Sequence, residues 1–188
     1  IPERTFVSQV SKAVELDLER LARMTDPYTQ MSLRLEASFG LRREESLKIR
    51  PAWADRGDRI VLLPSWAKGK RGREIPIRTA EQRQLLDEAK RLAGNGSLIP
   101  KTMRYVDQLK RFVAQCEKVD IHHVHGLRHH YAQARYRELT GWDCPAQGGP
   151  KSKQLTPEQK TIARDARMTI TAELGHGRGQ GTVIYLMR

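Results

Sequence analysis

The sequence is poor in cysteine and aromatic residues and lacks long apolar runs. Two cysteines, Cys116 and Cys144, are too few for a disulfide framework and form no CxxC pair, which excludes a disulfide-rich fold and favours a reducing compartment. No apolar run approaches the roughly 18 residues of a membrane-spanning helix, and no signal peptide opens the chain. These absences predict a soluble, intracellular protein. The chain begins at Ile1 and ends three residues after Tyr185, so we expect it to be a piece of a longer protein.

Acidic residues are also scarce relative to basic ones. The 188 residues contain 34 Lys and Arg against 22 Asp and Glu, which gives a net charge of +12 and a pI near 10.1. Such an excess predicts a polyanionic partner, with nucleic acid as the first candidate. A basic membrane-surface protein would need an amphipathic helix with a clean apolar face or a lipid signal, and we find neither. The length suits one hydrophobic core.

Apolar residues recur at helical spacing through most of the chain, which predicts a mainly helical protein. Gly40 is expected to end one helix, and Thr156 followed by Pro157 is expected to begin the last long one. We expect helices over residues 4–24, 28–39, 80–93, 102–117 and 157–174, a short helical turn over 41–47, and a helix that follows the histidine run and ends near residue 139. Residues 141–153 are the most loop-like.

The stretch 48–78 has a different pattern. Short β-type runs at Ile49, at residues 60–63 and at residues 75–77 are separated by turn signals at 55–58 and 68–72. This pattern predicts a small three-stranded antiparallel sheet, and with the helices an α+β fold that is mainly α. The second turn is basic, either as a solubilising hairpin or as a finger that faces phosphate; its cations are Lys68, Lys70, Arg71 and Arg73.

Five histidines between residues 122 and 130 raise the question of a metal site. Zinc or iron sites need a fuller ligand set than the i, i+4 pair His125 and His129, and the chain has no HExxH motif. We therefore expect no metal and no cofactor. A metal-dependent nuclease that uses this cluster remains the alternative interpretation.

Another set of residues suits chemistry at a phosphodiester. Arg42 and Arg128 each follow a Gly-Leu pair, and planar guanidinium groups stabilise the charge that develops on non-bridging oxygens. A tyrosine hydroxyl is a suitable covalent nucleophile, and its pKa near 10 makes it a tolerable leaving group. A lysine whose pKa is lowered by neighbouring cations is a suitable proton donor for the departing oxygen.

The order of these motifs resembles the successive boxes of the tyrosine recombinases, the phage-type integrases. The boxes are Gly40-Leu41-Arg42 with Glu45, Lys68-Gly69 leading to Arg73 and Ile75-Pro76-Ile77, His125-Gly126-Leu127-Arg128-His129, and Leu174-Gly175-His176 with Tyr185 nine positions later. The resemblance covers nearly all of residues 1–188 as one catalytic domain. It implies the catalytic-domain fold of the DNA breaking-rejoining enzymes and a bacterial cytoplasmic location, associated with the nucleoid during the reaction.

The resemblance also implies a role for each matching residue. Tyr185 would attack the scissile phosphate, giving a 3′-phosphotyrosyl link and a free 5′-hydroxyl without metal. Arg42 and Arg128 would clamp the phosphate, His125 would assist the tyrosine proton, and His176 would hydrogen-bond the phosphate. Glu45 would support Arg42 or His125, and Lys68 would be the general acid, with Lys70 as the fallback. Expected DNA contacts are Arg43, Lys70, Arg71, Arg73, Lys151 and Lys153.

This chain departs from the family pattern in two respects. His125 and His176 are 51 positions apart, which is longer than in most members and marks residues 141–167 as an enlarged insertion. It is either an arm that contacts DNA or a neighbouring subunit, or a solvated segment. The N-terminal core-binding domain and the tail after the tyrosine are expected to be missing. Three glycines between His176 and Tyr185 predict a hinge over residues 177–181, which would place Tyr185 away from the two arginines when DNA is absent.

The implied activity is site-specific recombination that integrates or excises a phage or another mobile element. The partner would be double-stranded DNA, bound by a tetramer of a protein that is monomeric when free, with no membrane involvement. A catalytically inactive DNA-binding module of the same fold is the second alternative.

Overall fold

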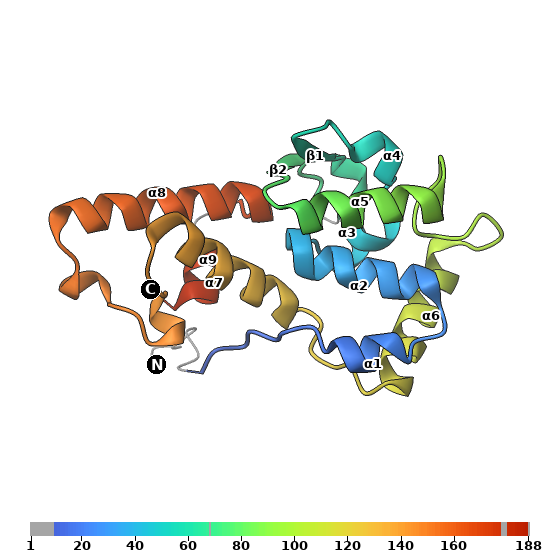
Figure 1. Ribbon diagram of the computed structural model, residues 1–188, viewed down its shortest axis with the longest axis horizontal. Helices are drawn as coiled ribbons and strands as arrows, with labels where there is room; N and C mark the ends of the chain where they lie inside the picture. Colours follow the sequence, from blue (N-terminus) through green and yellow to red (C-terminus); the bar gives the residue numbers. More distant parts are fainter. Residues whose placement is uncertain (1–9, 68, 178–179, 188) are drawn as a thin grey trace, which may run out of the picture.

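The computed structural model describes residues 10–67, 69–177 and 180–187, and these residues are mainly helical (Figure 1). The helices are α1 (Leu18–Ala22), α2 (Pro27–Phe39), α3 (Arg43–Lys48), α4 (Pro51–Ala54), α5 (Ala80–Ala93), α6 (Tyr105–Lys118), α7 (Gly126–Thr140), α8 (Pro157–Leu174) and α9 (Gln180–Leu186). The strands are β1 (Arg59–Leu62) and β2 (Arg73–Pro76), and short 3₁₀ turns occur at Pro64–Trp66, Pro145–Gln147 and Ser152–Gln154. Within these ranges, no helix is both long and apolar enough to cross a bilayer.

Local capping signals define the helices that the sequence predicted best. The Asp26 carboxylate accepts hydrogen bonds from the first turn of α2, and Gly40 ends that helix with a φ of 65°. A Cβ on Gly40 would lie 2.6 Å from the Tyr131 ring, so both the backbone angle and the close packing require glycine here. Thr156 caps α8 as expected. The predicted helices at α2, α5 and α8 are confirmed.

The helix predicted over residues 4–24 is wrong in the part that the structure describes, since only Leu18–Ala22 is helical and residues 1–9 lie outside that part. The Asp17 side chain accepts from the Arg20 backbone N–H, which starts the helix at Leu18. Residues 10–17, which precede α1, are irregular, and we call them the N-terminal strap. The Val14 backbone N–H donates to the Gly126 carbonyl at 3.0 Å, which holds the strap against the start of α7. Tertiary contact therefore overrides the apolar periodicity.

The predicted three-stranded sheet is also wrong, because the sheet has two strands in the part of the chain that the structure describes. β1 and β2 pair antiparallel, from Arg59 opposite Pro76 to Leu62 opposite Arg73. Ile49, the expected third strand, is instead the residue that ends α3, and Pro51 then begins the single turn of α4. Proline at the first helical position is favourable, whereas it cannot donate to a sheet ladder.

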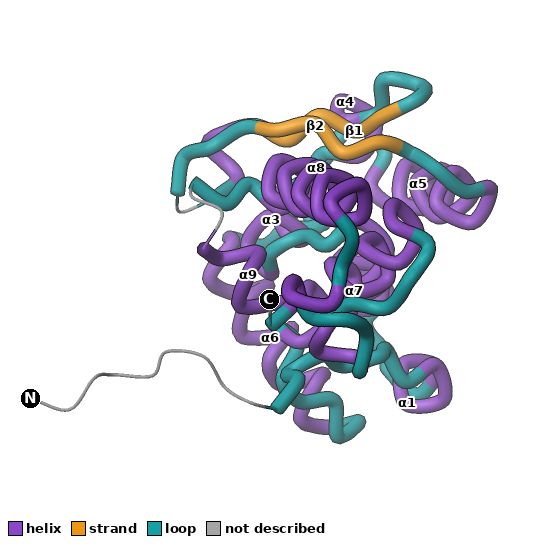
Figure 2. The backbone as a smooth tube through the Cα atoms, turned by 90° about the vertical axis from the view of Figure 1, so that its left-hand side faces the viewer, coloured by secondary structure: helices purple, strands orange, loops and turns teal. Residues whose placement is uncertain are grey.

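Three apolar clusters form the interior. One joins α2, α5 and the hairpin, and another joins α1, α3, α6 and the start of α7. The last joins α7, α8 and α9 and includes Tyr185. The hairpin lies over α8 (Figure 2), beside its C-terminal end (Figure 1). α9 packs against α7 and α8. This packing brings the C-terminal ends of α2 and α8 and the N-terminal end of α7 together with α9.

Candidate active site

Tyr185 lies inside a group of histidines. It is 7% exposed, and its hydroxyl is 2.9 Å from Nε2 of His125, the residue at the start of α7. The His129 ring lies against the phenol at a centroid separation of 3.9 Å, and the His176 ring meets it edge to face at 5.0 Å. α9, which packs on α7, thus places the tyrosine within reach of a neighbouring base.

The structure contradicts the expectation that Tyr185 stands away from the arginines. The Tyr185 ring lies 5.0 Å from the His176 ring, and Nε2 of His176 lies 3.4 Å from a terminal nitrogen of Arg128. Burial lowers the pKa of Arg128, and the charge of the nearby Tyr185 opposes that shift. The two groups are therefore already neighbours without DNA. Of the expected hinge, residues 178 and 179 lie outside the described part of the chain.

Arg128 connects the ends of two helices. It is 2% exposed, and its terminal nitrogens donate to the carbonyls of Gly40, at the end of α2, and of Leu174, at the end of α8, the latter at 3.0 Å. Carbonyls at helix C-termini lack intrahelical partners and favour cations. Among the described residues, the Arg128 Nε has no hydrogen-bond acceptor. This fixed guanidinium therefore keeps a donor available for an anion.

A buried carboxylate orients the other arginine. Glu45 accepts the Arg42 backbone N–H at 2.7 Å and its guanidinium at 2.9 Å, while the same guanidinium donates to the Gly175 carbonyl at 3.2 Å. The Arg42 side chain remains 34% exposed. Arg42 is therefore positioned beside Arg128 but stays accessible from solvent.

Arg73, one of the expected DNA contacts, faces the interior. Its side chain is only 5% exposed, and it donates two hydrogen bonds to Glu45 and one to the Glu173 carbonyl. Burial alone would raise the pKa of Glu45, but Arg73 and then Arg42 outweigh it and lower that pKa below its ordinary value. Arg73 thus faces inward and holds the carboxylate that orients Arg42.

The histidines of the site are held neutral near pH 7. Burial, followed by the charges of Arg128 and Arg42, lowers the pKa of both His125 and His176, in the second case to about 4. Burial and then the neighbouring His125 lower the pKa of His129 to about 4. A neutral His125 beside the phenol can accept a proton. In the described part of the chain, no three His, Cys, Asp or Glu side chains converge as metal ligands.

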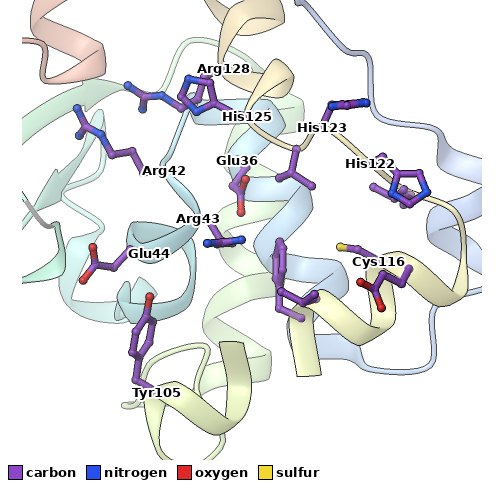
Figure 3. Close-up of a pocket in the computed structure, with 15 residues that line it drawn as sticks. Glu36, Arg42, Arg43, Glu44, Tyr105, Cys116, His122, His123, His125 and Arg128 are labelled. Atoms are coloured by element: carbon purple, nitrogen blue, oxygen red, sulfur yellow. The ribbon is translucent and has the colours of Figure 1, made fainter. Parts of the chain in front are cut away.

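A pocket of about 620 Å³ opens beside these residues (Figure 3). Arg42, His125 and Arg128 lie along one side of it, and the α6 residues Tyr105 and Cys116 lie along another. Arg43 of α3, one of the expected DNA contacts, lines the same pocket. The arginine pair is therefore reachable from an open pocket.

Glu36 lies in the floor of this pocket and gives the protein a specific pH dependence. Burial raises its pKa from 4.5 to about 8, although hydrogen bonding by Ser46 acts in the opposite direction. The folded chain then keeps a proton that the unfolded chain has lost, so the free energy of unfolding should fall as pH rises from 4.5 to 8. Glu36→Gln should remove this dependence and stabilise the fold at pH 8 by at most about 5 kcal/mol, measured by urea unfolding.

Glu44→Gln is the matched control for Glu36→Gln. Glu44 lies on α3, the helix after the one that carries Glu36, and forms a partly exposed ion pair with Lys48 of the same helix. This substitution should leave the slope of stability against pH unchanged between pH 5 and 8. Equal slopes in the wild type and in Glu36→Gln would contradict a buried, protonated Glu36.

Of the other predicted residues that the structure describes, those of the hairpin turn and those of the segment before α8 lie in two separate places. Lys68 falls outside the described residues. Lys70 and Arg71 are exposed in the hairpin turn, and the Arg71 guanidinium covers Gly177, where a Cβ would lie 2.8 Å from it. Lys151 and Lys153 are exposed near the N-terminal end of α8. That helix of 18 residues is about 27 Å long, so they lie far from His176.

Sequence reasoning gave no role to three residues of the site. His129 contacts Tyr185 directly, and its i, i+4 spacing from His125 was the available signal. Glu173 accepts hydrogen bonds from Tyr131 and Arg135 while its carbonyl binds Arg73, and no local pattern marks that role. Thr182 contacts His176 at 3.0 Å.

The chain is similar to known proteins in sequence and in fold. A family model described as "Integrase" matches residues 5–134, a range that contains Arg42, Glu45, His125 and Arg128 but ends before His176 and Tyr185. A search of curated proteins finds no significant match. Among solved structures, the catalytic domain of bacteriophage HP1 integrase is 18% identical with a TM-score of 0.57, and the match covers 94% of this chain and 86% of that one.

Two solved structures of the site-specific recombinase XerH also match. Its post-cleavage complex with a palindromic difH substrate is 14% identical with a TM-score of 0.53 over 95% of this chain and 49% of that one. Its pre-cleavage complex with difH is 14% identical with a TM-score of 0.54 over 94% and 50%. This chain therefore spans about half the length of XerH.

The mainly helical architecture is the catalytic-domain fold of the tyrosine recombinases. The match of the family model over most of the chain is more specific than this likeness of fold, and the chain belongs to the integrase family.

Proposed function

We propose that this protein is a site-specific DNA recombinase that cleaves and rejoins DNA through a 3′-phosphotyrosyl intermediate, in the service of a phage or another mobile element. The observation that carries the proposal is the 2.9 Å contact between the Tyr185 hydroxyl and His125 Nε2. A nucleophile and a base at this distance, next to two oriented arginines, are the parts that attack on a phosphodiester needs.

The residues suggest how a strand is cleaved. His125, whose pKa is lowered, takes the phenolic proton, and the Tyr185 oxygen bonds to phosphorus. The bond between phosphorus and the 5′ oxygen breaks, and that oxygen takes a proton from Lys68, with Lys70 as the alternative donor. Arg42 and Arg128 neutralise the non-bridging oxygens, and His176 hydrogen-bonds one of them. Neither metal nor cofactor enters these steps.

Charge and the relatives support double-stranded DNA as substrate. The chain carries a net charge of +12, and the two XerH structures are described as complexes with its difH substrate. We propose Arg43, Lys70 and Arg71 as backbone contacts near the scissile phosphate. Lys151 and Lys153 would reach a more distant part of the duplex, in a tetramer assembled on DNA from free monomers.

A covalent-trapping assay tests the proposal. The protein is incubated, with and without EDTA, with nicked suicide duplexes that carry a randomised segment near the nick. We expect a complex that survives SDS, disappears on proteolysis, forms equally in EDTA, and yields a DNA-linked peptide that contains Tyr185. Salt-sensitive DNA binding without any covalent product would indicate the inactive DNA-binding module. Loss of cleavage in EDTA would instead indicate the metal-dependent nuclease.

A further inference from the structure

His176 is connected to α8 through two hydroxyl groups in series. Its Nδ1 lies 3.0 Å from the Thr182 hydroxyl of α9, and that hydroxyl lies 2.7 Å from the Thr171 hydroxyl of α8. The Thr171 hydroxyl donates at 2.7 Å to the Arg167 carbonyl one turn earlier in the same helix. On its other side, His176 Nε2 lies 3.4 Å from a terminal nitrogen of Arg128.

The groups at the two ends of this series of hydrogen bonds determine which atom donates at each step. A carbonyl only accepts, so the Thr171 proton is used on Arg167, and Thr182 must donate to Thr171. The Thr182 oxygen is then free to accept from His176 Nδ1. A guanidinium only donates, so Arg128 also requires His176 Nε2 to be the unprotonated nitrogen. Both ends therefore select one tautomer.

We propose that Thr182 and Thr171 are positioning residues that hold neutral His176 with its proton on Nδ1 and its Nε2 lone pair toward Arg128. The consequence for cleavage rests on the function proposed above. Nε2 can donate a hydrogen bond to a phosphate oxygen only after the ring gains a proton, so binding of the scissile phosphate would be coupled to proton uptake at His176.

The surroundings of His176 fit this coupling. Burial and nearby cations keep the ring neutral in the free protein. A bound phosphate would offset those cations and supply an acceptor for Nε2, and both effects favour the protonated ring. The titratable and charged groups that face it are Arg128 and His125 from α7, Arg42 from the start of α3, Arg73 from β2, and Tyr185 from α9.

Nitrogen NMR of the free protein tests the tautomer without DNA. With the His176 signals identified by their loss in His176→Gln, the wild type at pH 7 should show a protonated Nδ1 and an unprotonated Nε2. Thr171→Val removes the group that accepts the Thr182 proton, so Thr182 can donate to Nδ1. Only Arg128 then still favours the proton on Nδ1, and the fraction of His176 protonated on Nε2 should rise above that of the wild type. Thr182→Ser should keep the wild-type pattern. A wild type protonated on Nε2, or an Nε2-protonated fraction in Thr171→Val equal to that of the wild type, would overturn the proposal.

Thr161→Val is the matched control, because Thr161 also lies on α8 and donates to the carbonyl four residues earlier, but it is exposed. It should change neither the NMR pattern nor cleavage. Thr182→Val should slow cleavage about ten-fold, as expected for a group that orients a site residue, and Thr182→Ser should restore it. Undiminished cleavage by Thr182→Val would refute the positioning role.

The pH profile separates this inference from the proposed function. Wild-type cleavage should decline at high pH as the phosphate-bound His176 loses its proton, whereas Thr171→Val should show a weaker decline because part of its neutral rings already donate from Nε2. Identical profiles would overturn the coupling. Absence of covalent product in every protein would defeat the proposed function alone, since the NMR result needs no catalysis.

Discussion

Tyr185→Phe should abolish the covalent complex with DNA, lowering its rate of formation by about 10⁴-fold or more, as expected when a nucleophile is removed. Phenylalanine keeps the ring that packs in the α7, α8 and α9 cluster and removes only the hydroxyl that contacts His125. We therefore expect DNA binding to persist and the free energy of unfolding to change by only about 1 kcal/mol. Suicide-duplex trapping, gel shift and urea unfolding measure the three quantities.

Tyr136→Phe provides the matched control for this substitution. Tyr136 is a buried tyrosine of the same apolar cluster on α7, so the change removes the same hydroxyl from a similar environment. Its covalent complex should form at the wild-type rate. If Tyr185→Phe still becomes linked to DNA, another residue is the nucleophile and the role proposed for Tyr185 is wrong.

Arg128→Lys should lower the rate of strand cleavage by about 10²-fold to 10³-fold, the range found when one preorganised donor is removed from a transition state. Lysine keeps the positive charge, but a single ammonium cannot serve the Gly40 and Leu174 carbonyls and a phosphate oxygen together. The loss should appear in the rate at saturating DNA more than in affinity, because other cations of the surface also attract the backbone. Single-turnover trapping at several DNA concentrations separates the two effects.

Arg137→Lys is the control for Arg128, since Arg137 lies on the same helix but is exposed and pairs with Asp143. It should cleave like the wild type. Because burying lysine at position 128 also costs stability, unfolding should be measured for both variants, and rates compared where each is folded. A folded Arg128→Lys protein with wild-type single-turnover rates would remove Arg128 from the proposed clamp.

Local signals account for the parts of the fold that the sequence predicted well. Asp26 before α2, Gly40 after it and Thr156 before α8 act through neighbouring backbone atoms, so their effect is visible in a short window. The N-terminal strap, predicted as helix, and Ile49, predicted as a strand, were wrong because distant contacts and neighbouring elements decide their structure. The strap is fixed by a contact between Val14 and Gly126, which are far apart in the chain, and no periodicity encodes that contact.

In the candidate site, too, the sequence predicted what depends on local pattern and missed what depends on contacts between distant residues. Motif order identified the residues that now surround Tyr185, because their spacing and chemistry are local properties. The direction of a side chain is not local. Arg73 and Arg71 are separated by one glycine, yet one is buried against Glu45 and the other is exposed. The contacts of Thr171 and Thr182 likewise required α8 and α9 to be placed side by side.

The anchoring of the two arginines also affects the order of folding. Arg42 and Arg128 bind carbonyls of Gly175 and Leu174, which are 133 and 46 positions away in the chain. Neither guanidinium acquires its orientation until the end of α8 has docked against α2 and α7. A partly folded chain would therefore carry the basic residues without the geometry that the proposed cleavage needs. The strand-breaking activity proposed above would then appear only together with the complete tertiary structure.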